Sequence, residues 1–200
     1  MKRSLASLIR LIGVALFVIV ATSYASPKIP RQSNVASEEY AVYSALISEE
    51  YMNEKVKLVV IANPTSGGKI ANDMADYLPQ LLAPLSRTTL DDYLARNSKP
   101  YRLSKSFSLK AKYVFVEYQE IEKLFENPDL DEAWKDFYRR FPASNGYVIL
   151  SRVGFNQAQD QALVSMSWMC NQRCGEGKLV LMSKRSGKWK VEKHHTMWMS

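Results

Sequence analysis

Residues 144–200 decide the fold, and they read SNGYVILSRVGFNQAQDQALVSMSWMCNQRCGEGKLVLMSKRSGKWKVEKHHTMWMS. Short runs rich in β-branched and aromatic residues are separated there by Gly, Asn, Asp and Ser clusters, a pattern typical of antiparallel hairpins. The pattern predicts four consecutive strands: Tyr147–Phe155, Gln161–Met169, Lys178–Ser183 and Lys188–Met199. The last strand has one largely charged face, which is typical of a solvated edge strand.

The residues before this stretch predict helices and two further strands. Ser37–Glu54 and Leu130–Phe141 each carry one apolar stripe at helical spacing, with Asp129 as a cap of the second helix. Val56–Ala62 and Tyr113–Tyr118 are short apolar runs that predict strands. We therefore expect a single α+β domain over residues 37–200, with N-terminal helices packed on a C-terminal antiparallel meander of four or more strands.

The first 25 residues have the features of a secretory signal peptide. Basic residues precede the apolar run LIGVALFVIV, and small residues stand before a cleavage site after Ala25. The apolar run is too short for a membrane-spanning helix, which needs roughly 20 residues. We expect a periplasmic or secreted protein without a membrane span after signal removal, with a flexible leader over residues 26–36.

Charge gives no indication of a nucleic-acid partner. The chain carries a formal net charge of +7. Loss of Lys2, Arg3 and Arg10 with the signal peptide would lower this to about +4. The remaining basic residues are dispersed along the chain, so we expect no nucleic-acid binding.

Cys170 and Cys174 are the only cysteines, at the end of a predicted strand. Two nearby cysteines in an exported protein predict one disulfide bond. A metal site that adds His194 and His195 is the alternative, but neighbouring strand residues point to opposite faces, so at most one histidine can join the cysteines. We therefore expect a disulfide, with no metal and no cofactor.

Arg152 and His195 are the two residues that we consider for a ligand-lining role. Arg152 shares the predicted covered face of its strand with Val148 and Leu150, and a buried guanidinium requires a partner. That partner is either a carboxylate of a covering helix, which we favour, or an anionic ligand. His195 is expected on one face with Trp189 and Val191. At such a position a histidine packed in the core is more common than a catalytic base.

Two resemblances accompany these patterns. The segments LSRVGFN, QALV, CGEGKLVLM and GKWKV, with a C-terminal tryptophan strand, resemble an uncharacterised family of exported bacterial proteins, which implies export and a shared fold but no activity. VVIANPTSGGKIA resembles the first nucleotide-binding segment of diacylglycerol and sphingosine kinases. The second glycine-rich loop of that family is missing, which favours an ordinary strand-to-helix turn.

No Ser-His-Asp order or nucleophile elbow can be assembled from the sequence. We therefore expect a non-enzymatic binding or interaction module of the cell envelope, with an unknown protein or small molecule as its partner. The alternative is a hydrolase or lyase with a small-ligand pocket on the sheet around Arg152 and His195.

Overall fold

The computed structural model describes residues 32–67 and 73–200. The expected signal peptide, residues 1–25, and the first part of the expected leader lie outside these residues. Helix α1 spans Gln32–Glu50, so residues 32–36 are helical and the predicted helix start at Ser37 was wrong by five residues. No proline follows Pro30 in this region, and the backbone beyond it can therefore adopt helical geometry.

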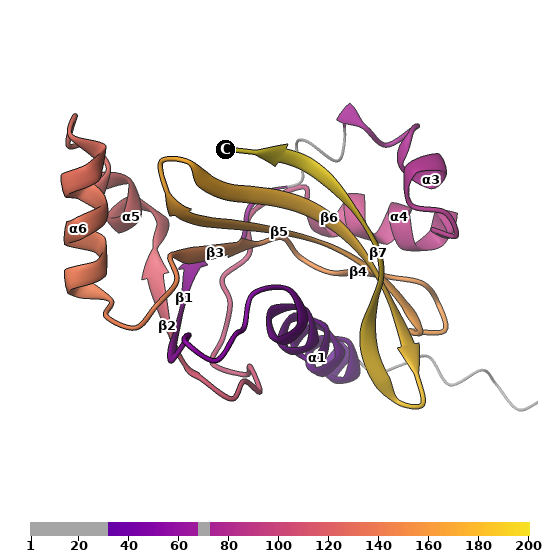
Figure 1. The fold of residues 1–200 in the computed structure, drawn as a ribbon. Coiled ribbons are helices and arrows are strands. Elements are labelled where there is room, and N and C mark those ends of the chain that lie inside the picture. Colours follow the sequence, from indigo (N-terminus) through magenta and orange to yellow (C-terminus); the bar gives the residue numbers. More distant parts are fainter. Residues whose placement is uncertain (1–31, 68–72) are drawn as a thin grey trace, which may run out of the picture. The chain divides into compact units, whose positions relative to one another are not determined.

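The strands form one mixed sheet of seven members in the order β2-β1-β3-β5-β6-β7, with β4 beside β5 (Figure 1). The antiparallel pairing predicted for the C-terminal part is confirmed for β3–β5, β5–β6 and β6–β7. Strand β1 instead runs parallel to both β2 and β3, because long connections that contain helices return the chain in the same direction. The bounds are β1 Leu58–Asn63, β2 Lys112–Glu117, β3 Tyr147–Leu150, β4 Gly154–Phe155, β5 Gln161–Asn171, β6 Cys174–Arg185 and β7 Lys188–Met199.

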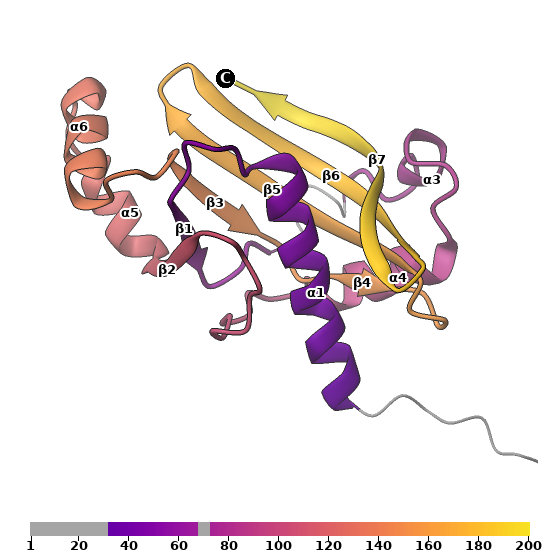
Figure 2. The same ribbon diagram turned by 60° about the horizontal axis from the view of Figure 1, so that its bottom comes forward.

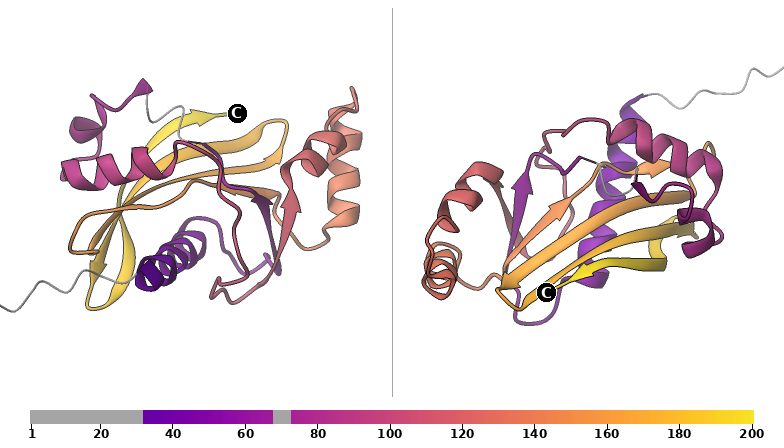
Figure 3. Two further views of the ribbon diagram at one scale, coloured as in Figure 1. Left: turned by 180° about the vertical axis from the view of Figure 1, so that it is seen from behind. Right: turned by 90° about the horizontal axis from the view of Figure 1, so that it is seen from above.

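Helix α1 lies across one face of the sheet (Figure 2). The remaining helices belong to the opposite face, with α3 and α4 near one end of the strands and α5 and α6 near the other (Figure 3). Strand alternation explains this division: Val59 and Ile61 of β1 contribute to the core beneath α1, whereas Val60 and Ala62 contribute to the core beneath α5 and α6. The helix bounds are α3 Leu78–Leu81, α4 Arg87–Arg96, α5 Tyr118–Leu124 and α6 Leu130–Arg140.

The turn after β1 fixes a distant loop. The side-chain Oδ1 of Asn63 accepts a hydrogen bond from the backbone N–H of Leu103 at 2.9 Å. The Thr65 hydroxyl accepts another from the backbone N–H of Tyr101 at 2.9 Å. These polar side chains therefore hold the chain over residues 101–103, while residues 68–72 lie outside the described part.

The first predicted C-terminal strand, Tyr147–Phe155, is divided into β3 and β4. Side chains satisfy backbone groups of the intervening residues 151–153: the amide Oδ1 of Asn97 accepts from the backbone N–H of Arg152 at 2.8 Å, and Glu39 Oε1 accepts from that of Val153 at 3.1 Å. The Ser151 hydroxyl in turn accepts from the backbone N–H of Ser165 at 2.8 Å. Strand pairing is interrupted here because side chains replace part of the hydrogen-bond ladder.

The expected placement of His195 on the face that carries Trp189 and Val191 is wrong. Strand β7 pairs with β6 through a register shift: Met182 lies opposite Val191, but Leu181 lies opposite Lys193. One extra residue in β7 reverses the alternation beyond it. His195 therefore pairs with Leu179, on the face of α3 and α4, whereas Trp189 belongs to the core beneath α1.

Candidate ligand-binding groove

Arg152 forms a bidentate ion pair with Glu39 of α1. The distances from Nε to Oε1 and from the terminal nitrogen to Oε2 are both 2.9 Å, and the Glu39 side chain is only 4% exposed. The hydrogen bonds to Glu39 raise the pKa of Arg152. The guanidinium also stacks over the ring of Tyr101, with its central carbon 4.0 Å from the ring centroid. The structure thus places Arg152 against a carboxylate of the covering helix.

The Tyr43 hydroxyl belongs to the same cluster. It lies 2.9 Å from Glu39 Oε1 and 2.8 Å from the carbonyl oxygen of Ser151. Burial raises the pKa of Tyr43 well above its ordinary value, and the charge of Glu39 raises it further. This phenol therefore stays protonated and can donate its hydrogen bond at neutral pH.

Two identical segments of α1 carry the carboxylates that face the sheet. The sequence SEEY occurs at residues 37–40 and again at 48–51. A separation of eleven residues is about three helical turns, so both segments present their glutamates on the same side. This repeat indicates that the helix carries carboxylates toward the sheet, but it does not distinguish Glu39 from the other three glutamates as the partner of Arg152. The other contacts join Glu38 to Lys184 and Trp189, Glu49 to the backbone N–H of Val191, and Glu50 to Lys178.

Arg152 and His195 do not converge. Arg152 contacts α1 on one face of the sheet, whereas His195 lies opposite Leu179, which packs in the core beneath α3 and α4. Strands β5 and β6 also separate the segments that carry these two residues. The arrangement does not provide the joint pocket that an acid–base pair of Arg152 and His195 would need.

The disulfide bond between Cys170 and Cys174 is present, as predicted. It closes the turn between β5 and β6. The hydroxyl of Tyr138 in α6 donates a hydrogen bond to the Cys170 carbonyl oxygen at 2.8 Å, and Gln172 Nε2 donates to Asp131 Oδ1 at 2.9 Å. Two hydrogen bonds thus attach the tip of the β5–β6 hairpin to α6.

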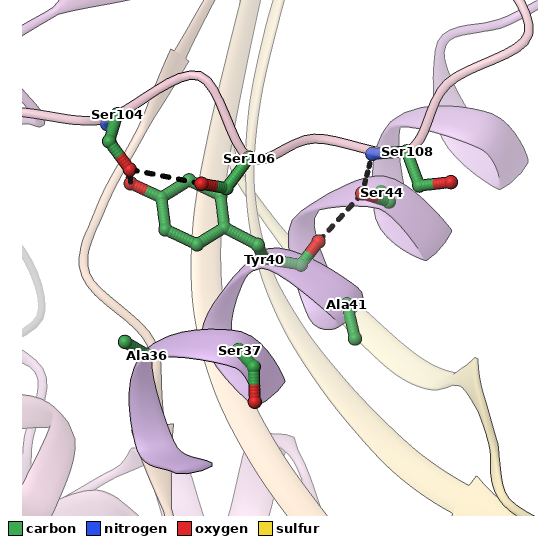
Figure 4. Close-up of a pocket in the computed structure, with 8 residues that line it drawn as sticks. All are labelled: Ala36, Ser37, Tyr40, Ala41, Ser44, Ser104, Ser106 and Ser108. Atoms are coloured by element: carbon green, nitrogen blue, oxygen red, sulfur yellow. Dashed lines mark hydrogen bonds between the residues drawn. The ribbon is translucent and has the colours of Figure 1, made fainter. Parts of the chain in front are cut away.

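One concavity lies between α1 and residues 104–108, with a volume of about 410 Å³ (Figure 4). Serine side chains dominate its lining, but several of their groups already bind the protein. The Tyr40 hydroxyl accepts from the backbone N–H of Ser104 at 2.6 Å, and the Ser44 hydroxyl accepts from that of Ser108 at 2.9 Å. These hydrogen bonds attach residues 104–108 to α1. Packing of this loop on the helix therefore accounts for the polar lining of the concavity, without a ligand.

A second concavity, the aromatic groove, has a volume of about 420 Å³, within the usual range for small-ligand sites. It is formed by α5, α6, the start of β3 and the tip of the β5–β6 hairpin. Tyr118 and Leu130 are 41% and 39% exposed at its mouth, although both are large apolar residues. The lining residues are Tyr118, Ile121, Glu122, Phe125, Leu130, Trp134, Tyr147, Met169, Asn171 and Gln172.

Ring contacts hold the walls of the aromatic groove in place. The centroids of Phe125 and Trp134 are 4.7 Å apart, and the ring of Trp134 is stacked on that of Tyr147 at 6.1 Å and 18°. Trp134 in turn contacts the buried Phe137 at 5.3 Å. With the disulfide-closed hairpin as the other wall, the groove is preformed, which reduces the entropy lost on ligand binding.

Three polar groups in the aromatic groove, the hydroxyls of Tyr118 and Tyr147 and the carboxylate of Glu122, have no hydrogen-bond partner within residues 32–67 and 73–200. The Tyr147 hydroxyl forms no hydrogen bond there, and its oxygen is not sealed from solvent. Burial raises the pKa of Tyr147 to about 12, so the phenol is protonated at neutral pH. The Glu122 carboxylate likewise has no hydrogen bond or ion pair in this part of the chain. An apolar site with a few unpartnered polar groups has the composition of a small-ligand site.

No protein family, curated protein or solved structure matches this chain. Across the described ranges, His, Cys, Asp and Glu do not gather into a group of three that would hold a metal ion. No helix in the same ranges combines the length and hydropathy needed to cross a membrane. A function can therefore be inferred only from the geometry and lining of the aromatic groove.

The aromatic groove was missed by sequence reasoning, for a physical reason. Its lining comes from four segments between residues 118 and 172, and each aromatic residue has a sufficient local explanation as helix or strand packing. Trp134 and Phe137, for example, lie on the apolar stripe of α6 and belong to the core beneath that helix. One sequence feature could have indicated the groove: the aromatic residues from Tyr113 to Tyr147 are more numerous than the apolar stripe of α6 alone accounts for.

Proposed function

We propose that this chain is an exported, non-enzymatic binding module of the cell envelope, and that the aromatic groove holds its ligand. In this proposal residues 1–25 act as a signal peptide. Residues 37–200 form one α+β domain in which the N-terminal helix packs on the sheet. The basic and apolar pattern of the first residues supports export, and a disulfide bond is compatible with an oxidising compartment.

One observation carries the proposal: a preformed aromatic groove contains a phenol hydroxyl, that of Tyr147, which forms no hydrogen bond with any described residue. The fully buried polar side-chain atoms of the described residues are hydrogen-bonded, whereas the Tyr147 oxygen remains accessible from the groove. A polar group that adds nothing to the internal network is available to orient a ligand.

The positions of Arg152 and His195 favour binding over hydrolase or lyase chemistry. The guanidinium of Arg152 is already bound by Glu39, and His195 lies on the other face of the sheet. An acid–base mechanism needs two such groups within reach of one reacting atom. We therefore retain the non-enzymatic function and propose no reaction.

Titration with the neutral fluorescent probe phenylnaphthylamine tests the proposal. We expect saturable fluorescence enhancement with one site per chain, weakened at least about tenfold by Tyr118→Ala, because the mutation removes one wall of the groove. Tyr77→Ala is the matched control, since Tyr77 is also exposed, at 64%, but does not line the groove. Absence of saturable binding, or equal losses in both variants, would overturn the proposal.

A further inference from the structure

We propose that the ligand of the aromatic groove is an organic cation, with an alkylated ammonium head group against the aromatic lining. This inference rests on the proposed function and specifies its ligand. Four aromatic residues, Tyr118, Phe125, Trp134 and Tyr147, line the same space of about 420 Å³. The faces of aromatic rings carry negative charge density and attract cations, including quaternary ammonium groups.

The rim of the aromatic groove is rich in acidic residues. Residues 118–132 contain six acidic residues and one lysine. Glu120 and Glu132 are engaged by arginine or lysine side chains of α6. The carboxylate of Glu122 is not engaged by any described residue, and it is the one acidic group that lines the groove. A cation in the groove would therefore meet an unneutralised carboxylate beside aromatic walls.

Two other concavities lack this combination, and a third, lined by Trp134, Tyr138 and Asp131, also carries Lys135 and Arg139, which would repel a cation. The serine-lined concavity near Tyr40 has one aromatic residue and no acidic group. A larger concavity of about 710 Å³, at the end of α1, has no aromatic lining, and its three lysines, Lys57, Lys110 and Lys112, outnumber its one carboxylate, that of Glu54. Of these concavities, only the aromatic groove combines aromatic rings and a carboxylate without a lysine or arginine in its lining.

The polar groups of the aromatic groove fit the same ligand. The Tyr147 phenol, whose pKa is raised to about 12, remains neutral and can donate to a hydroxyl or carbonyl of the ligand beyond its charged nitrogen. Gln172 is held on Asp131, so its position at the rim is fixed. We therefore expect a small cation that carries one oxygen acceptor, of which choline is the simplest probe.

The test compares choline with dimethylbutanol, in which a carbon atom replaces the charged nitrogen without change of shape. Both compete with phenylnaphthylamine for the wild-type protein. We expect choline to bind at least about tenfold more tightly than dimethylbutanol, because only choline gains the cation–π and carboxylate attraction. A second arm uses a short peptide with trimethyl-lysine, which distinguishes a free small cation from a side chain of a partner protein.

Glu122→Gln keeps the shape of the rim and removes its charge. We expect this variant to lose most of the preference for choline and to bind dimethylbutanol as the wild type does. Glu126→Gln is the matched control, since Glu126 also has no partner among the described residues but does not line the groove. Equal affinity for the two compounds, or no effect of Glu122→Gln, overturns the cation inference and leaves the groove as a neutral apolar site. If phenylnaphthylamine itself does not bind, the proposed function fails, and the inference with it.

Discussion

Two buried tyrosines show how differently two regions of this molecule use a polar group. Beneath α1, the Tyr43 hydroxyl lies within hydrogen-bond distance of both Glu39 and the Ser151 carbonyl. In the aromatic groove, the Tyr147 hydroxyl has no partner within the described residues. A polar group with internal partners stabilises the fold, whereas one without them is available to a ligand. The two regions therefore respond differently to mutation.

The largest effect is expected at Arg152. Arg152→Ala leaves the buried carboxylate of Glu39 without its cation, and we expect a loss of about 3–5 kcal/mol in the free energy of unfolding. Arg87→Ala is the matched control, since Arg87 pairs with Asp91 on the surface, where both side chains are more than half exposed. We expect the control to change stability by less than about 1 kcal/mol. Urea denaturation measures both, and equal small changes would contradict a stabilising role of the Arg152 pair.

Arg152 also illustrates what the sequence could predict. Its position on a covered face required a partner, and a helix carboxylate was the favoured one, but the identity of Glu39 depends on how α1 crosses the sheet. The register shift in β7 had no local signal, and it moved His195 to the other face. Strand positions follow from local alternation, whereas bulges and the meeting of four segments at the aromatic groove are tertiary properties.

Removal of the disulfide bond tests the wall of the aromatic groove. The double variant Cys170→Ser and Cys174→Ser is expected to lose about 2 kcal/mol of stability, because the bond closes only a short loop. We also expect weaker phenylnaphthylamine binding, since the hairpin that carries Asn171 and Gln172 forms part of the lining. Unchanged affinity in a stable double variant would show that the hairpin does not preorganise the groove.

Alkaline pH is expected to destabilise the protein through Tyr147. The pKa of this phenol is about 12 in the folded state and about 10 in the unfolded chain. Above pH 10 the unfolded state therefore binds fewer protons than the folded state, and stability falls until pH 12. Tyr147→Phe removes this contribution. Between neutral pH and pH 12 the free energy of unfolding of the variant should therefore fall by roughly 2 kcal/mol less than that of the wild type. Identical pH profiles of the two proteins would contradict the burial of this phenol.

A pair of tyrosine substitutions compares the two regions directly at neutral pH. Tyr43→Phe removes a buried hydroxyl that has partners, and we expect a loss of about 1–2 kcal/mol. Tyr147→Phe removes one that has none, and we expect a change within about 0.5 kcal/mol together with weaker binding of choline. Thermal melting and probe competition on both variants measure these effects. A larger loss of stability for Tyr147→Phe than for Tyr43→Phe would reverse the assignment of the two regions.

The most direct test of ligand binding in the aromatic groove uses the indole N–H signals of the four tryptophans in a nitrogen-15 NMR titration. Trp134 lines the groove, whereas the indole N–H of Trp168 donates to the Asn145 carbonyl and that of Trp189 donates to Glu38. On addition of phenylnaphthylamine we expect the Trp134 signal to shift in a saturable way while those of Trp168 and Trp189 stay in place. A shift confined to Trp168, Trp189 or Trp198, or no shift at all, would contradict binding in the groove.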